Sequence, residues 1–506
     1  MSTEATDEVL EHLWEIHFHF HLGEPALKLL ERICSELVEA SVSSSSWQAS
    51  PFGQAGIRMC TTTTLDELRL IWQRYLSMIR ASNAESKDFK KRFTAAAEVK
   101  FKNSYDAARD VFPVQVGVAA GGPLWRDFVE SGLSRDLYTE YWSAGMVSGW
   151  KPVDTVFANP TFAVSSSTKT FPLHHAAEPC HGFDLSVTLA AASSEDSAQS
   201  LAQRCASSAR EQFNTWSRIV SQGLQAGRIY VRFFAGGAIN FCHALQQGGD
   251  EAAILLTAPY SSKTLALDER EYRSSSLGRG APCCFTTIDA SHVVDSHGLV
   301  TTLFCCEALL EQKPVHSVLY TRTILQRAIQ APSNFTQVLG ADASLVSLFV
   351  GIAPKPYLDG FTHSVDAAEI AHARAVIPSS TIAAHLAWAR TDVPQGNHTL
   401  TCDGQKLASL LFEVMVCLTP YDDIGAFVQN VDSSRYEVLC TRAAFVDFLV
   451  RVNRSVTPQI WMTTIQRFIS LCTNLGDSRN ARRSNSYQDL ATHLFLRGID
   501  LGLLWR

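Results

Sequence analysis

The middle of the chain alternates short apolar runs with helical patterns, and this alternation limits the possible fold more than any other feature. Arg228 to Phe234 (RIYVRFF) is rich in β-branched and aromatic residues, and Gly236-Gly237 then leads into a run with helical spacing. Residues 252–258 and 283–288 predict two more strands, and residues 298–310 predict a helix. Strands that alternate with such helices predict an α/β, Rossmann-like fold with a mostly parallel sheet.

Helical patterns precede this region. Residues 5–40 predict two helices broken at residues 23–25 (Gly-Glu-Pro), followed by a Ser-rich loop over residues 41–46. Residues 63–82 and 85–110 predict two more helices, because apolar residues recur there at spacings of three and four.

The chain is again expected to be mostly helical after about residue 320, where prolines interrupt the pattern. We therefore predict three regions, namely a helical N-terminal region (1–150), a Rossmann-like α/β domain (151–320) and a mostly helical C-terminal region (321–506).

Composition excludes several classes of protein. Charged residues make up 18% of the 506 residues and apolar residues 46%, which excludes a mostly disordered chain. The net charge of −7 argues against a general nucleic-acid binder, and no DNA partner is expected. No apolar run reaches the roughly 18 residues that span a bilayer, and the acidic N-terminus is unlike a signal peptide. We expect a cytoplasmic protein without a membrane partner.

The cysteines and histidines do not form a recognisable metal site. The thirteen cysteines include the adjacent pairs Cys283-Cys284 and Cys305-Cys306 but no C-x-x-C, so ordinary buried thiols are expected. His17 and His21 would share one face of a helix, with His19 between them, but no neighbouring acid or cysteine completes a site. We expect no metal and no cofactor.

Gly236-Gly237 is the first candidate site. A glycine pair between a strand and a helix lets backbone amides approach a phosphate or a nucleoside, so we consider both glycines substrate-binding. The pair is not G-x-G-x-x-G, and no acidic residue follows about 20 positions later. A tight turn without a ligand is the alternative.

The segment IDASHVVDSHG (288–298) is the densest polar cluster at a predicted strand end. Asp289, Ser291 and His292 could supply a base, a nucleophile and an orienting group, and they are the candidate catalytic residues. Asp295 and His297 lie in the same segment. The alternative is helix capping and turn formation, which Asp and Ser also favour.

Asp422-Asp423 follows an apolar run and could bind a guanidinium group or a metal. Neighbours one residue apart do not share a helix face, so a Pro-Tyr-Asp-Asp helix start is the alternative. We consider both residues candidate substrate ligands.

Residues 87–102 form a basic stretch within an acidic chain. Two acidic residues lie among its six basic ones, which are Lys87, Lys90, Lys91, Arg92, Lys100 and Lys102. A second, smaller cluster contains Arg479, Arg482 and Arg483. Either stretch could contact phosphates, and a solvated helix face is the alternative.

Several phrases resemble a family of fungal proteins that share a domain of unknown function with the dynein axonemal assembly factors. The phrases are NPTF (159–162), GRIYVRFFAGGAINFCHALQ (227–246), IDASHVVDSHGLVTTL (288–303), CTRAAFVDFL (440–449) and NSYQDLATHLFLRGI (485–499). The zinc-finger cysteines of many relatives are absent here, as is the glutamate of an Asp-Asp-x-x-Glu signature after Asp422-Asp423.

The resemblance implies an activity. Some members of this kind of protein are arginine-containing cyclodipeptide synthases, which condense arginyl-tRNA with a second aminoacyl-tRNA to a diketopiperazine in fungal secondary metabolism. The expected partners are therefore aminoacyl-tRNAs, held by the basic stretch. Because an aminoacyl ester is already activated, no ATP-binding loop is needed, and the chain has no G-x-x-x-x-G-K-[ST].

Two other functions stay open at this point. A methyltransferase using S-adenosylmethionine would place Gly236-Gly237 and Asp289 at the cofactor, although the glycine-rich fingerprint is missing. A non-catalytic assembly or scaffold protein is the other alternative, suggested by the axonemal relatives.

Overall fold

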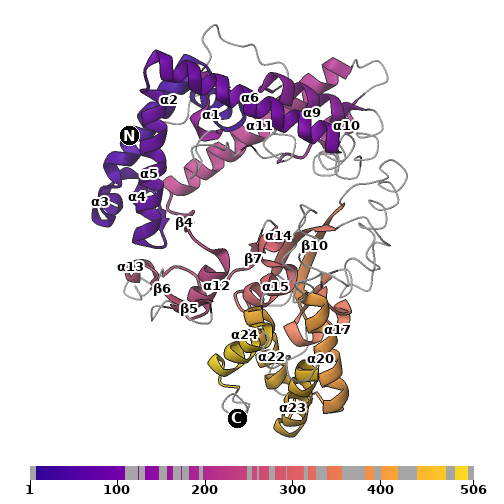
Figure 1. Ribbon diagram of the computed structural model, residues 1–506. Helices are drawn as coiled ribbons and strands as arrows, with labels where there is room; N and C mark the ends of the chain where they lie inside the picture. Colours follow the sequence, from indigo (N-terminus) through magenta and orange to yellow (C-terminus); the bar gives the residue numbers. More distant parts are fainter. Residues whose placement is uncertain are drawn as a thin grey trace. The chain divides into compact units, whose positions relative to one another are not determined.

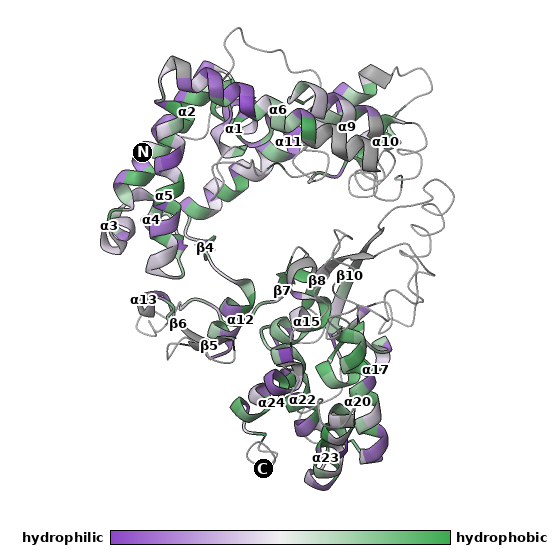
Figure 2. Cartoon of the chain, in the orientation of Figure 1, coloured by the Kyte–Doolittle hydropathy of each residue, from purple (hydrophilic) through white to green (hydrophobic). Residues whose placement is uncertain are grey.

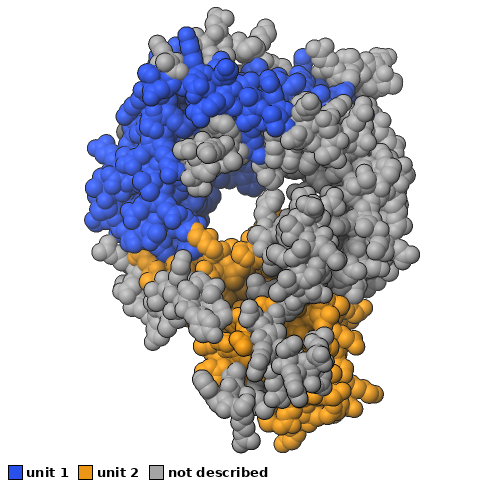
Figure 3. Space-filling view, in the orientation of Figure 1, with its two compact units in different colours: residues 1–235 blue, residues 236–506 orange. Residues whose placement is uncertain are grey.

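The computed structural model of the chain forms two compact units, residues 1–235 and residues 236–506, coloured blue and orange in Figure 3. The boundary between them, after Ala235, falls inside the region 151–320. The structure describes residues 7–108, 124, 132–147, 157–162, 173, 182–192, 198–247, 253–258, 261–272, 280–291, 293–312, 317–325, 339–355, 382–391, 400–419, 442–474 and 485–499.

The first unit is built mainly from helices (Figure 1). These helices are α1 (Asp7–Phe18), α2 (Glu24–Ala40), α3 (Ser44–Ala49), α4 (Pro51–Gln54), α5 (Thr62–Ile79), α6 (Asn83–Ala108), α9 (Leu133–Ala144), α10 (Ser186–Ala190) and α11 (Ala198–Gln225). Its short strands are β1 (His21–Leu22), β2 (Ile57–Met59), β3 (Phe157–Ala158) and β4 (Val231–Phe233), and a 3-10 turn, η2, covers Pro160–Phe162.

Local signals set several helix ends in this unit. Gly23 precedes α2 in an extended conformation, with a proline in the first turn, so the predicted break between α1 and α2 is confirmed. The expected loop over residues 41–46 is wrong at its end, because the Ser43 side chain accepts a hydrogen bond from the Ser46 amide at 3.1 Å and starts α3.

Aromatic side chains fill the core of the first unit. Phe20 makes edge-to-face contacts with Phe93 of α6 and with Tyr141 and Trp142 of α9, at ring-centroid distances of 5.9, 5.3 and 5.3 Å. Trp14 of α1 is 1% exposed and packs in the same cluster. These contacts explain why α1, α6 and α9 pack together although they are distant in the sequence.

The NPTF phrase has a structural role. Asn159 is fully buried, and its amide nitrogen donates to the carbonyl oxygens of Ile16 and His19, both at 2.8 Å. Its side-chain oxygen accepts bonds from the Thr161 amide and hydroxyl at 3.0 and 2.8 Å. Asn159 thus satisfies the carbonyl groups at the end of α1, beside the antiparallel pair of β1 and β3.

The second unit combines helices with a small mixed sheet. Its helices are α12 (Ala238–Gln246), α13 (Glu269–Tyr272), α14 (Val293–His297), α15 (Leu299–Glu307), α17 (Ala343–Val350), α20 (Gly404–Leu418), α22 (Arg442–Ser455), α23 (Pro458–Asn474) and α24 (Asn485–Leu496). Its strands are β5 (Ala253–Ala258), β6 (Ser261–Leu265), β7 (Thr287–Asp289), β8 (Val318–Leu325), β9 (Ile352–Pro354) and β10 (Ile382–Arg390).

The main sheet of this unit has the strand order β7-β8-β10-β9. Strands β7 and β8 are parallel, whereas β10 runs antiparallel to both β8 and β9. Leu319 and Trp388 are fully buried on one face and pack against the helices, while Tyr320 is 47% exposed. The apolar face of α17, green in Figure 2, belongs to the same core.

The expectation of an α/β chain holds only in its coarse form, since helices and strands mix but helices predominate. The mostly parallel, Rossmann-like sheet is not found among the described strands. The three predicted strands belong to three different sheets, because β4 pairs with β2 of the first unit and β5 pairs with β6.

The mostly helical C-terminal region also needs correction. Strands β9 and β10 lie within it, and β10 is a central strand of the sheet. Residues 382–390 (IAAHLAWAR) are alanine-rich, so helix propensity is high there, and pairing with β8 along eight residue pairs overrides that propensity.

Candidate functional site

The candidate site in the second unit lies at the carboxyl end of β7. Asp289 is the last residue of the strand and is exposed, and in the register of the parallel pair it lies opposite Tyr320 of β8. The Ala290 amide donates to the Tyr320 carbonyl at 2.9 Å and fixes the start of the loop. An exposed carboxylate and an exposed phenol thus share the open face of the sheet.

Ser291 contacts the Asp289 carboxylate directly. Its hydroxyl donates a hydrogen bond to Asp289 Oδ1 at 2.6 Å, and its backbone amide donates to the same oxygen at 3.0 Å. The amide bond forms a local turn, as the capping alternative predicts. The hydroxyl bond pairs a nucleophile with a base, so the same geometry could transfer a proton or an acyl group.

The structure places only part of the predicted catalytic set. Asp289 and Ser291 are brought together as predicted, whereas His292 lies outside the described residues. Asp295 belongs to α14, and nothing is described of its side chain.

Gly236-Gly237 does not share a sheet edge with this site. Strand β4, which precedes the glycines, pairs with β2, whereas β7 belongs to the four-stranded sheet. Gly237 lies directly before α12 with φ of −68°, which any residue can adopt, and a Cβ there would lie 3.2 Å from the Asn240 amide nitrogen. The pair is therefore a strand-to-helix turn, and its role as a substrate loop stays a prediction.

The basic stretch lies on α6, where one helix face is positively charged. Lys87, Lys90 and Lys91 are exposed and spaced by three and four residues, so they share a face. The opposite side, with Phe93 fully buried, packs into the core. Arg92 is exposed and pairs with Asp88 at 3.0 Å. Lys100 and Lys102 continue the helix, but their side chains are not described.

The remaining sequence candidates lie outside the described residues. This holds for Asp422 and Asp423, the predicted substrate ligands, and for Arg479, Arg482 and Arg483.

The histidines of α1 and β1 are buried rather than arranged around a metal. Burial lowers the pKa of His19 to about 3. Burial, and secondarily the charge of Lys90, lowers the pKa of His21 to about 4. Neutral imidazoles in an apolar core are the result. Within the described ranges, no group of three or more His, Cys, Asp or Glu side chains could hold a metal ion.

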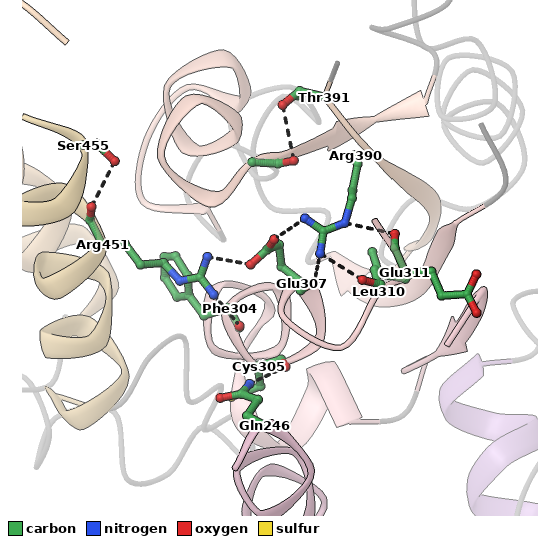
Figure 4. Close-up of polar contacts among 11 residues, drawn as sticks. Gln246, Phe304, Cys305, Glu307, Leu310, Glu311, Arg390, Thr391, Arg451 and Ser455 are labelled. Carbon is green, nitrogen blue, oxygen red and sulfur yellow. Dashed lines mark hydrogen bonds and ion pairs between the residues drawn. The ribbon is translucent and has the colours of Figure 1, made fainter. Parts of the chain in front are cut away.

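Sequence reasoning missed a buried ion cluster, formed by Glu307, Arg390 and Arg451 (Figure 4). Glu307 at the end of α15 has a side chain that is 4% exposed, and each of its oxygens accepts a bond of 2.6 Å from one of the two arginines. Arg390 also donates to the carbonyl oxygens of Glu307, Leu310 and Glu311 at 2.7, 2.9 and 3.2 Å.

The ion cluster ties three parts of the second unit together. Arg390 ends β10, and Arg451 lies on α22 with its guanidinium 5.7 Å from the centre of the Phe304 ring. Buried charges need such complete pairing, because an unpaired one would keep its desolvation cost. Each charge lies in an apolar sequence context, and no local signal pairs them.

Comparison with known proteins does not identify a family. The chain matches no family model, no curated protein and no solved structure. Among the helices that the structure describes, none combines the length and the apolar character needed to cross a membrane.

Proposed function

We propose that this chain is an aminoacyl-tRNA-dependent cyclodipeptide synthase that joins arginine to a second amino acid as a cyclo(Arg-Xaa) diketopiperazine. The observation that carries the proposal is the 2.6 Å hydrogen bond from the Ser291 hydroxyl to the exposed Asp289 carboxylate at a strand end. The phrases that contain both residues also resemble the fungal family with such members.

The proposed reaction needs few groups. The α-amine of one aminoacyl-tRNA attacks the ester carbonyl of the other, the ester bond breaks, and the tRNA hydroxyl leaves with a proton. The free amine of the resulting dipeptidyl-tRNA then attacks the second ester and closes the ring. Asp289 would accept a proton from an attacking group, and Ser291 could first take the aminoacyl group from the tRNA.

The basic face of α6 supports the choice of tRNA as the carrier. Lysines that share one helix face suit the phosphate backbone, and binding through them needs no particular sequence. The methyltransferase alternative has less support, since it requires Gly236-Gly237 and Asp289 at one edge of a parallel sheet. No observation favours a scaffold role over the synthase.

The test is product formation from aminoacyl-tRNA by the purified chain. Incubation with tRNA, ATP, arginine, other amino acids and the matching synthetases is expected to give a cyclo(Arg-Xaa) product, detected by mass spectrometry. RNase added beforehand should abolish the product. Product formation that survives RNase, or no diketopiperazine with any amino-acid mixture, would contradict the proposal.

Variants at the strand end test the site. We expect Asp289→Asn to lower turnover by roughly 100-fold, because it removes the base. Ser291→Ala should be inactive if a covalent aminoacyl-serine forms, and partly active if the two esters react directly. Thr287→Ala is the matched control, since Thr287 is exposed two residues earlier on the same strand. If Asp289→Asn turns over like the Thr287 variant, the Asp289 and Ser291 bonds serve only the turn.

The α6 face predicts a salt effect on tRNA binding. Changing Lys87, Lys90, Lys91 and Arg92 to glutamine should weaken binding and lower the log–log salt slope by about 0.7–0.9 for each phosphate that these side chains neutralise. The control changes four exposed basic residues elsewhere by the same total charge, namely Lys28, Arg32, Lys406 and Arg454. Equal slopes for the two variants would show that tRNA binds at another surface.

A further inference from the structure

Three cysteines meet where α12 packs against α15 in the second unit. Cys242 of α12 is half-buried and touches two hydrophobic clusters, whereas Cys305 and Cys306 of α15 are 4% and 5% exposed. All three carry free thiols. We call these three residues the thiol cluster.

The contacts within the thiol cluster sort its members into pairs. Cys305 Sγ lies 4.0 Å from His243 Nε2, and the Cys305 carbonyl accepts a bond of 2.9 Å from Gln246 (Figure 4). The Cys306 thiol is hydrogen-bonded to Cys242. Because neighbouring helix positions point about 100° apart, Cys305 faces His243 while Cys306 faces Cys242.

The pairing makes the two facing thiols unequal. The hydrogen bond from Cys306 lowers the pKa of Cys242, and it outweighs the opposing effect of burial. The same hydrogen bond and burial raise the pKa of Cys306. A thiolate is the reactive form of cysteine, so Cys242 is the stronger nucleophile of the two.

We propose that Cys242 and Cys306 are an oxidisable dithiol, in which a hydroperoxide oxidises Cys242 and Cys306 then closes a disulfide between α12 and α15. The adjacency of Cys242 to a second thiol, rather than to water alone, carries this assignment. It does not depend on the synthase activity.

The reaction proceeds in two balanced steps. The Cys242 sulfur attacks one oxygen of the hydroperoxide, the O–O bond breaks, and the leaving oxygen takes the Cys242 proton to become an alcohol or water. The Cys306 sulfur then attacks the Cys242 sulfenic sulfur, and the S–O bond breaks. Hydroxide leaves and takes the Cys306 proton as water. Two electrons pass from the thiols to the peroxide.

The experiment maps the oxidised cysteines in the full-length protein. Reduced protein is treated with hydrogen peroxide, the free thiols are blocked with a maleimide, and the peptides are sequenced by mass spectrometry. We expect a Cys242–Cys306 linked peptide that disappears on reduction with dithiothreitol. Its formation should be about tenfold faster than the oxidation of Cys472, a buried thiol of α23 whose pKa is raised to about 12.

A variant traps the intermediate. In Cys306→Ser, Cys242 should remain a sulfenic acid that reacts with a 1,3-diketone probe, whereas Cys242→Ser should give no such adduct at Cys306. If either variant does not fold, the mapping of the unaltered protein decides. Linkage of Cys305 instead of Cys306, or oxidation of Cys242 no faster than that of Cys472, would overturn the proposal.

Discussion

Replacing Glu307 by glutamine is expected to lower the free energy of unfolding of residues 236–506 by about 3–5 kcal/mol. The side chain is 4% exposed and accepts a 2.6 Å bond from each of two arginines. Glutamine keeps the size of the side chain but removes the charge, so both guanidinium groups would stay in a desolvated place without a counter-charge. The Arg390 bonds to three carbonyl oxygens cannot replace that charge.

Pulse proteolysis in urea would measure this loss, with the cleaved peptides assigned to either compact unit by mass spectrometry. Glu413→Gln is the matched control, because Glu413 is exposed on α20 and its variant should unfold like the parent protein. A loss below about 1 kcal/mol for Glu307→Gln would mean that water or nearby groups solvate the arginines. Residues 1–235 should be unaffected by either change.

Acidification is expected to destabilise residues 1–235 selectively between pH 6.5 and pH 4. His19 and His21 have pKa values of about 3 and about 4 in the folded chain, against 6.5 in the unfolded chain. Below pH 6.5 the unfolded state therefore binds more protons, so stability is complete above that pH and falls as the pH decreases. Each histidine should contribute a loss of about 1.4 kcal/mol per pH unit in this window.

Urea titrations at pH 7.5, 6.0 and 5.0, read by proteolysis of the first unit, would test this dependence. His21→Gln should flatten it by about one histidine's share, because the glutamine side chain does not titrate. His493→Gln in the second unit is the control, and it should leave the pH dependence of residues 1–235 as in the parent. A parent profile that is flat from pH 7 to pH 5 would show that both imidazoles protonate without leaving the core.

Helix positions could be predicted from the sequence where the signals are local. The predicted helices at 63–82 and 85–110 correspond to α5 and α6, because apolar spacing and caps act within a few residues. The Asp289–Ser291 contact is local for the same reason, since the two residues are only two positions apart. Its position at a strand end follows from the β-branched run before it.

Strand pairing and buried charge contacts were decided only by the tertiary structure. The strand RIYVRFF satisfies the same sequence criteria whether it pairs with β7 or with β2, and the packing of the first unit places it beside β2. Arg390 and Arg451 lie 83 and 144 residues from Glu307, and the separate sequence segments give no sign of their pairing. Local rules thus determined the helices and the Asp289–Ser291 turn, whereas the sheet, the ion cluster and the thiol cluster depend on long-range contacts that form only when the chain is folded.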